Sequence, residues 1–108
     1  MFGFLRPRVQ NITTAELEQR LKSGEKLTII DVREPWEYAE GHIPGSLLRP
    51  LGQIQNWAQE FQKDQPLILI CRSGGRSAQA YQYLAAQGFT NLKNVDGGIV
   101  AWRGPVER

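Results

Sequence analysis

A lone cysteine followed by glycines and arginines is the feature of this sequence best suited to chemistry. Cys71 ends the apolar run LILIC and opens the segment CRSGGRS at 71–77. Two glycines and two arginines thus follow the thiol directly, ahead of a stretch with helical character. A turn that leads from a strand into a helix can direct successive backbone N–H groups inward and bind an anion there. The pattern indicates a thiolate stabilised by its own loop.

The expected chemistry of this cysteine is nucleophilic. A free cysteine has a pKa near ~8.5, and about 3.5 to 7.5 is usual beside cations or at a helix N-terminus. Inward amides, the helix N-terminus and the charges of Arg72 and Arg76 all favour the thiolate. The same groups could hold an oxyanion substrate or a charged product. A cysteine that closes an apolar strand is typically an inert buried thiol, but the loop after Cys71 favours a reactive one.

Length and composition restrict the class of protein. With 108 residues and 41% hydrophobic content, we expect one globular domain over residues 1–108. The 13 Lys and Arg against 11 Asp and Glu give a net charge of +2 spread along the chain. No nucleic-acid or membrane partner is therefore expected, whereas small anionic partners fit.

The cellular location follows from cysteine usage and from the lack of targeting signals. One cysteine cannot form an internal disulfide and fits a reducing compartment, so we expect a cytoplasmic protein. The N-terminal stretch MFGFLRPRVQ is too short in apolar residues for a signal peptide. No run approaches the roughly 20 apolar residues of a membrane span.

Strand and helix signals alternate along the chain. Apolar, β-rich runs predict strands at 9–12, 27–32, 47–50, 67–71 and 92–95. Helical spacing predicts helices at 14–23, 52–63 and 77–88, with short ones beginning at Pro35 and covering 99–102. The helix at 14–23 has a capping box of Thr13 and Glu16, a hydrophobic staple of Ile12 and Leu17, and a stop at Gly24.

This order of elements predicts an α/β fold with a mostly parallel sheet and helices on both faces. Ligands of such sheets bind beyond the carboxyl ends of the strands. Two interior strands end there in reactive side chains, in DVRE at 31–34 and CRSGGRS at 71–77. Both segments should therefore reach the same edge of the sheet.

Three separated segments resemble signature segments of the rhodanese family. Its members are sulfurtransferases that carry a sulfane sulfur on a cysteine as a persulfide. The three segments are DVREPWEYAEGHIPGS at 31–46, CRSGGRS at 71–77 and NVDGGIVAWRG at 94–104. The resemblance spans about residues 9–104 with the segments in the family's order. It implies a rhodanese-like, five-stranded parallel sheet flanked by helices.

The resemblance also implies roles for individual residues. Cys71 corresponds to the nucleophile and sulfur carrier. The persulfide-binding cradle corresponds to Arg72, Ser73, Gly74, Gly75, Arg76 and Ser77. Asp31 and Arg33 match a family pair near the pocket, for which a structural salt bridge and substrate contact are both open. Two-domain members often carry a third basic residue where Ser73 stands here, so donor preference is open as well.

Three other side chains near these motifs have a catalytic and a structural interpretation. His42 could act as a base, but a thiol activated by its loop needs none, which favours hydrogen bonds that fix the 41–46 loop. Trp36 and Trp102 could line the mouth of the pocket. Packing between helix and sheet is the more typical role of such aromatic residues.

The implied reaction has two steps. Cys71 attacks the outer sulfur of a small anionic donor such as thiosulfate, held by Arg72, Arg76 and loop amides, and sulfite departs. Cyanide in assays, or a cellular thiol on a small molecule or protein, then takes the sulfur from the persulfide. The acceptor must be external because the chain has no second cysteine. No metal or organic cofactor is implied.

Two alternatives stay open. Cysteine phosphatases separate their cysteine and arginine by one residue more than the four between Cys71 and Arg76. The shorter loop leaves less room for a tetrahedral oxyanion, which disfavours phosphatase or arsenate reductase chemistry. The second alternative is a non-catalytic binding module, because a fold alone does not prove an activity. The reactive loop argues against it. A nucleotide-binding Walker pattern is missing from the sequence.

Overall fold

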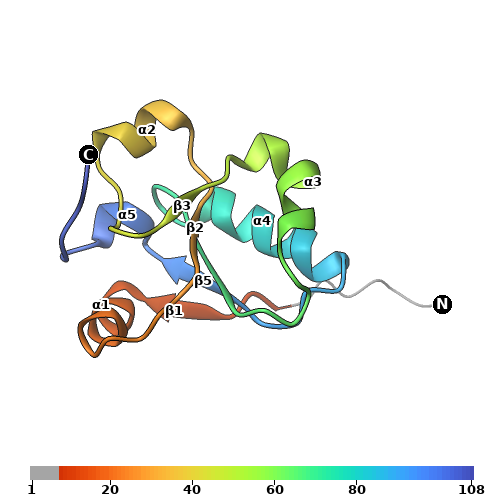
Figure 1. The fold of residues 1–108 in the computed structure, drawn as a ribbon, viewed down its shortest axis with the longest axis horizontal. Helices are drawn as coiled ribbons and strands as arrows, with labels where there is room; N and C mark the ends of the chain where they lie inside the picture. The colour runs from red at the N-terminus through yellow and green to blue at the C-terminus, as the bar shows by residue number, and fades with distance from the viewer. Residues whose placement is uncertain (1–7) are drawn as a thin grey trace.

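Within residues 8–108, five short parallel strands form one sheet in the middle of the molecule (Figure 1). The computed structural model describes residues 8–108. The strands are β1 (Asn11–Thr13), β2 (Ile29–Asp31), β3 (Leu47–Leu48), β4 (Leu67–Ile70) and β5 (Leu92–Asp96). Their order across the sheet is β1-β5-β4-β2-β3, and every pairing is parallel. The predicted five-stranded α/β fold is confirmed.

Helices cover both faces of this sheet. They are α1 (Thr14–Lys22), α2 (Pro35–Glu40), α3 (Ile54–Trp57), α4 (Gly75–Ala86) and α5 (Gly98–Ala101). Figure 1 shows α1 and α5 on one side of the sheet and α3 and α4 on the other. Along β4, Leu67 and Leu69 pack in the cluster on the α4 side, and Ile68 and Ile70 pack in the cluster that contains Leu17 of α1. Burial on both faces explains why β4 is apolar at every position.

Helix α1 begins and ends where its sequence signals predict. The Thr13 side chain accepts a hydrogen bond from the amide of Glu16 at 3.0 Å. Ile12 and Leu17 are both buried in the same cluster, as expected of a hydrophobic staple. After the C-cap residue, Gly24 has a φ of +89°, the left-handed conformation that ends many helices.

The continuous helix predicted at 52–63 is wrong. A 3₁₀ turn at Leu51–Gln53, the short α3 and a second 3₁₀ turn at Ala58–Glu60 take its place. Ile54, Trp57 and Ala58 are buried as the helical spacing predicts, and Phe61 is half-buried. Two hydrogen bonds hold the start of this segment. The indole of Trp57 donates to the carbonyl of Pro50 at 2.7 Å, and the amide of Leu51 donates to that of Val32 at 3.0 Å.

Two predictions concern the membrane and the N-terminus. Within residues 8–108, no helix is long and apolar enough to cross a membrane. The prediction that the N-terminal stretch is not a signal peptide concerns residues that are in large part, at 1–7, outside the described ones.

Candidate active site

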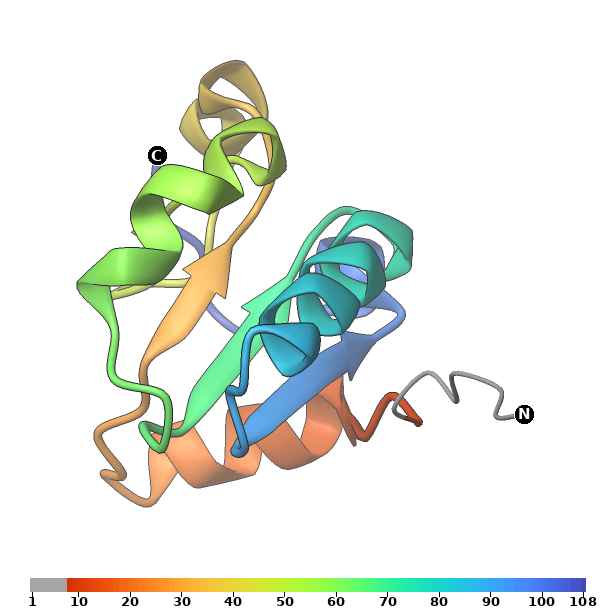
Figure 2. The same ribbon diagram turned by 90° about the vertical axis from the view of Figure 1, so that its right-hand side faces the viewer.

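The loop that follows β4 lies at the carboxyl end of the sheet. Figure 2 shows β2, β4 and β5 with their arrowheads pointing the same way, toward the end of the sheet where this loop turns into α4. Strands β2 and β4 are neighbours, and the amide of Val32 donates to the carbonyl of Ile70 at 2.9 Å. The structure thus brings the segments 31–34 and 71–77 to one edge, as predicted.

The sulfur of Cys71 is buried among hydrogen-bond donors of its own loop. The residue is only 1% exposed. Its Sγ accepts from the amide of Gly74 at 3.1 Å and from the hydroxyl of Ser77 at 3.3 Å. Gly74 adopts a φ of +109°, a conformation that suits glycine, and this turn directs its amide at the sulfur. The loop therefore forms a cradle around the thiol.

This cradle lowers the pKa of the Cys71 thiol below its ordinary value of 9.0. Burial raises the pKa, but hydrogen bonds from the Ser77 hydroxyl and from the amides of Ser77, Gly74 and Ser73 together outweigh it. The sulfur also faces the first turn of α4, whose N-terminal end favours negative charge. The site therefore favours the nucleophilic thiolate form.

The two loop arginines lie in different surroundings. Arg72 is exposed, and its guanidinium makes no ion pair or hydrogen bond within residues 8–108. Arg76 forms a bidentate pair with Glu37 of α2, with nitrogen–oxygen distances of 2.7 and 2.8 Å. The Arg76 hydrogen bonds hold the pKa of Glu37 at about 2, against the effect of its burial. Of the two, Arg72 is the cation open to an incoming anion.

Glu37 is a site residue that the sequence did not reveal. It is 7% exposed, and its Oε1 also accepts from the amide of Glu34 at 3.0 Å, which completes a capping box on α2. The spacing of two glutamates around Pro35 is the readable signal for that box. The partner Arg76 lies 39 residues away in sequence, so no local pattern could announce the ion pair.

Asp31 and Arg33 form a buried ion pair, with side chains that are 1% and 5% exposed. Nε and Nη2 of Arg33 lie 2.9 and 2.7 Å from the Asp31 carboxylate. Nη2 also donates to the carbonyl of Gly41 at 2.8 Å. The pair thus ties the end of β2 to the loop after α2, which supports the structural of the two interpretations.

His42 fixes the loop after α2. Its Nδ1 lies 2.8 Å from the carbonyl of Tyr38, and its ring stacks on that of Tyr38 with centroids 3.6 Å apart. Its backbone pairs with that of Glu107 in an isolated antiparallel bridge. These contacts agree with the structural role that the sequence favoured.

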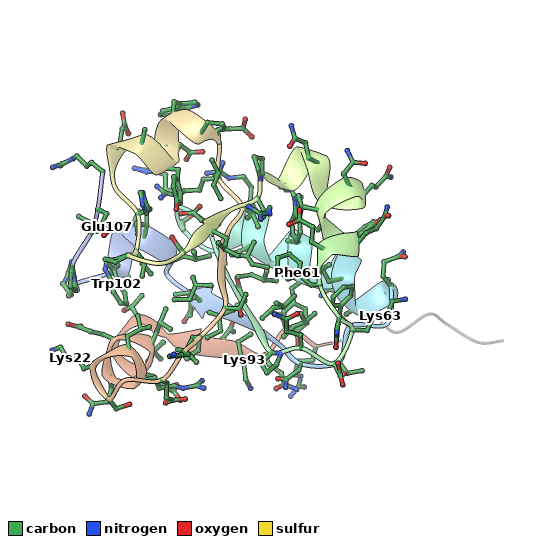
Figure 3. The ribbon with its side chains drawn as sticks, in the orientation of Figure 1. Lys22, Phe61, Lys63, Lys93, Trp102 and Glu107 are labelled. Atoms are coloured by element: carbon green, nitrogen blue, oxygen red, sulfur yellow. The ribbon has the colours of Figure 1, made fainter. Side chains whose placement is uncertain are left out.

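The two tryptophans near the motifs differ in burial. Trp102 is buried in the cluster beside α1, and its indole donates to the carbonyl of Pro105 at 2.9 Å (Figure 3). Packing is therefore confirmed for Trp102 and wrong for Trp36, which is 66% exposed. Because Glu37 turns inward from α2, the residue before it on the helix points outward.

Helix α5 contacts the backbone of the loop that carries Cys71. The amides of Ile99 and Val100 donate to the carbonyls of Cys71 and Arg72 at 2.9 and 3.0 Å. Gly98, which has a φ of +60°, lets the two backbones approach this closely. The segment 94–104 therefore shapes the backbone that carries the thiol.

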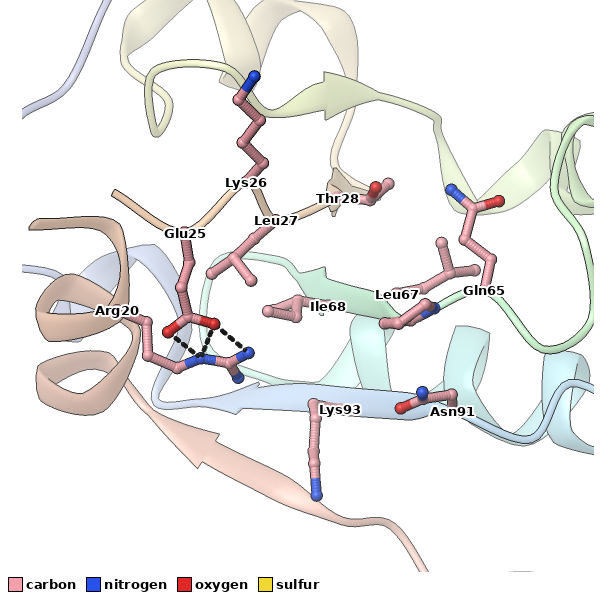
Figure 4. Close-up of a pocket in the computed structure, with 11 residues that line it drawn as sticks. Arg20, Glu25, Lys26, Leu27, Thr28, Gln65, Leu67, Ile68, Asn91 and Lys93 are labelled. Atoms are coloured by element: carbon pink, nitrogen blue, oxygen red, sulfur yellow. Dashed lines mark hydrogen bonds and ion pairs between the residues drawn. The ribbon is translucent and has the colours of Figure 1, made fainter. Parts of the chain in front are cut away.

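A hollow of about 330 Å³ lies at the amino end of the strands, opposite the Cys71 loop. Lys26 and Lys93 reach in opposite directions there, and Arg20 is paired with Glu25 (Figure 4). Because these charges do not converge, the hollow has no evident anion site. Within residues 8–108, no three His, Cys, Asp or Glu side chains are grouped to hold a metal ion.

Comparison with known proteins gives a consistent result. The family model of the rhodanese-like domain matches residues 13–105. A sulfurtransferase of Allochromatium vinosum is 42% identical over 94 residues, which cover 87% of this chain and 88% of that protein. The thiosulfate sulfurtransferase GlpE of Pseudoalteromonas translucida is 41% identical over 82 residues, 76% of this chain and 78% of that protein.

The solved structures agree with these relatives. The crystal structure of a rhodanese-like domain protein from Staphylococcus aureus has a TM-score of 0.85 at 36% sequence identity, and the match covers 92% of this chain and 97% of that chain. The chain belongs to the rhodanese-like domain family.

Proposed function

We propose that this protein is a rhodanese-type sulfurtransferase that moves a sulfane sulfur from a donor such as thiosulfate to a thiophilic acceptor through a persulfide on Cys71. The observation that carries the proposal is the cradle, in which the Gly74 amide and the Ser77 hydroxyl both donate to the sulfur. Relatives named as sulfurtransferases, at 42% and 41% identity, support it.

In the first half-reaction the Cys71 thiolate attacks the outer sulfur of thiosulfate. A sulfur–sulfur bond to Cys71 forms, the bond to the sulfonate sulfur breaks, and sulfite leaves with the electron pair. Amides of Ser73, Gly74, Gly75 and Ser77 stabilise the negative charge on the persulfide. The exposed guanidinium of Arg72 attracts the anionic donor, and the paired Arg76 holds the first turn of α4 against α2.

In the second half-reaction an external nucleophile attacks the outer sulfur of the persulfide. Cyanide leaves as thiocyanate, or a small or protein thiol leaves as a new persulfide, and the Cys71 thiolate is regenerated. The chain cannot resolve the persulfide itself, because Cys71 is its only cysteine. We place this reaction in the cytoplasm, within one domain over residues 1–108 and without a cofactor, nucleic acid or membrane partner.

Two assays distinguish the sulfurtransferase from a phosphatase and from a non-catalytic binding module. Wild-type protein should form thiocyanate from thiosulfate and cyanide, and the nearly isosteric Cys71→Ser variant should form none while keeping its circular dichroism spectrum. A phosphatase would instead hydrolyse p-nitrophenyl phosphate, and a binding module would turn over neither substrate. Thiocyanate formation by the serine variant at the wild-type rate would rule out Cys71 as the carrier.

A further inference from the structure

We propose that Glu37 sets the charge that an anionic substrate meets beside Cys71. Glu37 holds Arg76 in an ion pair without net charge, which leaves Arg72 as the cation that the substrate meets. Glu37 is thus a specificity-determining residue that acts through Arg76. The inference deepens the proposed function, on which its consequences for sulfur donors rest.

The geometry of the pair makes it a fixed part of the site. Each carboxylate oxygen of Glu37 faces one terminal nitrogen of Arg76, at 2.7 and 2.8 Å. Such fork-to-fork contacts add geometric specificity to the strength of an ion pair. The carboxylate also accepts from the Glu34 amide at 3.0 Å, and the side chain of Glu37 is 9% exposed. Glu37 therefore stays in place while a substrate approaches Arg76.

The charge of the Glu37–Arg76 pair acts on the Cys71 sulfur. The pKa of Arg76 is raised by Glu37 first of all, against the effect of burial, and the Cys71 thiolate also contributes to raising it. Arg76 lies in the first turn of α4, next to Ser77, whose hydroxyl donates to the sulfur, so the charge of Arg76 acts on the thiolate. With both partners ionised the pair carries no net charge, whereas an unpaired Arg76 would add a full positive charge beside Cys71. The present site should thus favour reagents and donors with extra negative charge less strongly than a site with an unpaired Arg76 would.

Variants that change the net charge of the Glu37–Arg76 pair by one unit at a time test this inference. Glu37→Gln adds one positive charge beside Cys71, Arg76→Gln adds one negative charge, and the double variant restores neutrality. Glu40→Gln is the matched control, because Glu40 is an exposed glutamate of the same helix that is outside the pair. All five proteins are compared after thermal unfolding shows that each is folded.

The readout is alkylation of Cys71 by iodoacetate and by iodoacetamide, which differ by one negative charge. In both reactions a carbon–sulfur bond forms, the carbon–iodine bond breaks and iodide leaves. The same thiolate attacks both reagents, so any change in its pKa cancels in the ratio of the two rate constants. Loosening of the loop alone would change both rates together, whereas a change of charge moves the ratio.

We expect the iodoacetate-to-iodoacetamide ratio to rise about three- to tenfold in Glu37→Gln, to fall by a similar factor in Arg76→Gln, and to return to near the wild-type ratio in the double variant. Glu40→Gln should leave it nearly unchanged. An unchanged or lower ratio in Glu37→Gln, or a double variant that does not return, overturns the inference.

The same variants separate this inference from the proposed function. If Glu37→Gln also lowers the KM for thiosulfate, both stand. A shifted alkylation ratio in a protein that transfers no sulfur would keep the role of Glu37 and refute the sulfurtransferase. Sulfur transfer by a protein whose alkylation ratio does not shift would keep the sulfurtransferase and refute the role of Glu37.

Discussion

Gly98 of α5 lies so close to the backbone of Cys71 that a β-carbon at this position would stand 2.5 Å from the carbonyl oxygen of Cys71. Real Cβ atoms essentially never approach backbone oxygens at that distance. The backbone around Cys71 therefore depends on a glycine 27 positions later in the chain. Strain from the φ of +60° would add to the clash.

The first prediction is that Gly98→Ala destabilises the protein by about 2 to 4 kcal/mol, from the clash and the left-handed backbone together. Sulfur transfer should fall sharply even in the folded fraction, because α5 must move away from the loop that bears Cys71. Urea unfolding and thiocyanate formation measure the two effects. Gly52→Ala is the control, because nothing lies within 4 Å of a β-carbon there. Equal behaviour of the two variants would contradict this role of α5.

The second prediction concerns the pH dependence of Cys71. Because the folded-state pKa of the thiol is lowered, alkylation by iodoacetamide should reach half its maximal rate below the ~8.5 of a free cysteine. Ser77→Ala removes a hydrogen bond to the thiolate and should raise this midpoint. Ser73→Ala should not, since Ser73 acts through its backbone amide. Coincident profiles for all three proteins would show that the hydroxyl plays no such part.

The third prediction is that Arg72→Ala raises the KM for thiosulfate about tenfold, or ~1.4 kcal/mol, with a smaller effect on kcat. Arg72 is exposed and its guanidinium has no partner within residues 8–108, so its charge is available to the donor. Arg20→Ala removes an arginine at the other end of the strands and serves as the control. A KM equal to that of wild type would mean that backbone amides hold the donor without Arg72.

The fourth prediction is a loss of stability in acid that depends on Glu37. Its pKa is about 2 in the folded protein and 4.5 ordinarily, so the pair with Arg76 stabilises the fold above pH 4.5. This contribution should disappear as the pH falls from about 4.5 to about 2, because the unfolded chain then binds the proton more readily. Its size is on the order of 1 to 3 kcal/mol, reduced by the partial exposure of Arg76.

Denaturant unfolding between pH 2 and pH 6 measures this loss, with wild type and Glu37→Gln compared at each pH. The glutamine variant should be the less stable protein at pH 6, and the difference should shrink toward pH 2. A constant difference across that range would mean that the ion pair contributes nothing to the acid sensitivity.

The sequence predicted most of the fold because its strands and helices are marked by strong local patterns. The apolar run of β4 and the cap at Thr13 are examples. It failed at 52–63, where helical spacing identified the buried positions Ile54 and Trp57 but not the 3₁₀ turns around them. Contacts with distant backbone, such as the hydrogen bond from the amide of Leu51 to the carbonyl of Val32, are not readable from helical spacing.

Only the part of the site that is local in sequence could be predicted. Cys71 and its cradle are contiguous in sequence, so their chemistry could be read from one segment. Glu37 and Gly98 were not identified, because each acts on the loop through a contact between distant parts of the chain. The opposite surroundings of Arg72 and Arg76 likewise follow from α2, which no spacing within the loop reveals.

The most direct test of the account is the intact mass of the protein after incubation with thiosulfate and removal of the excess. Wild-type protein should gain one sulfur atom, located on the peptide that contains Cys71, and should lose it again as thiocyanate on addition of cyanide. Cys71→Ser should gain none under the same conditions. A folded wild-type protein that gains no sulfur, or a serine variant that gains one, would contradict the persulfide on Cys71.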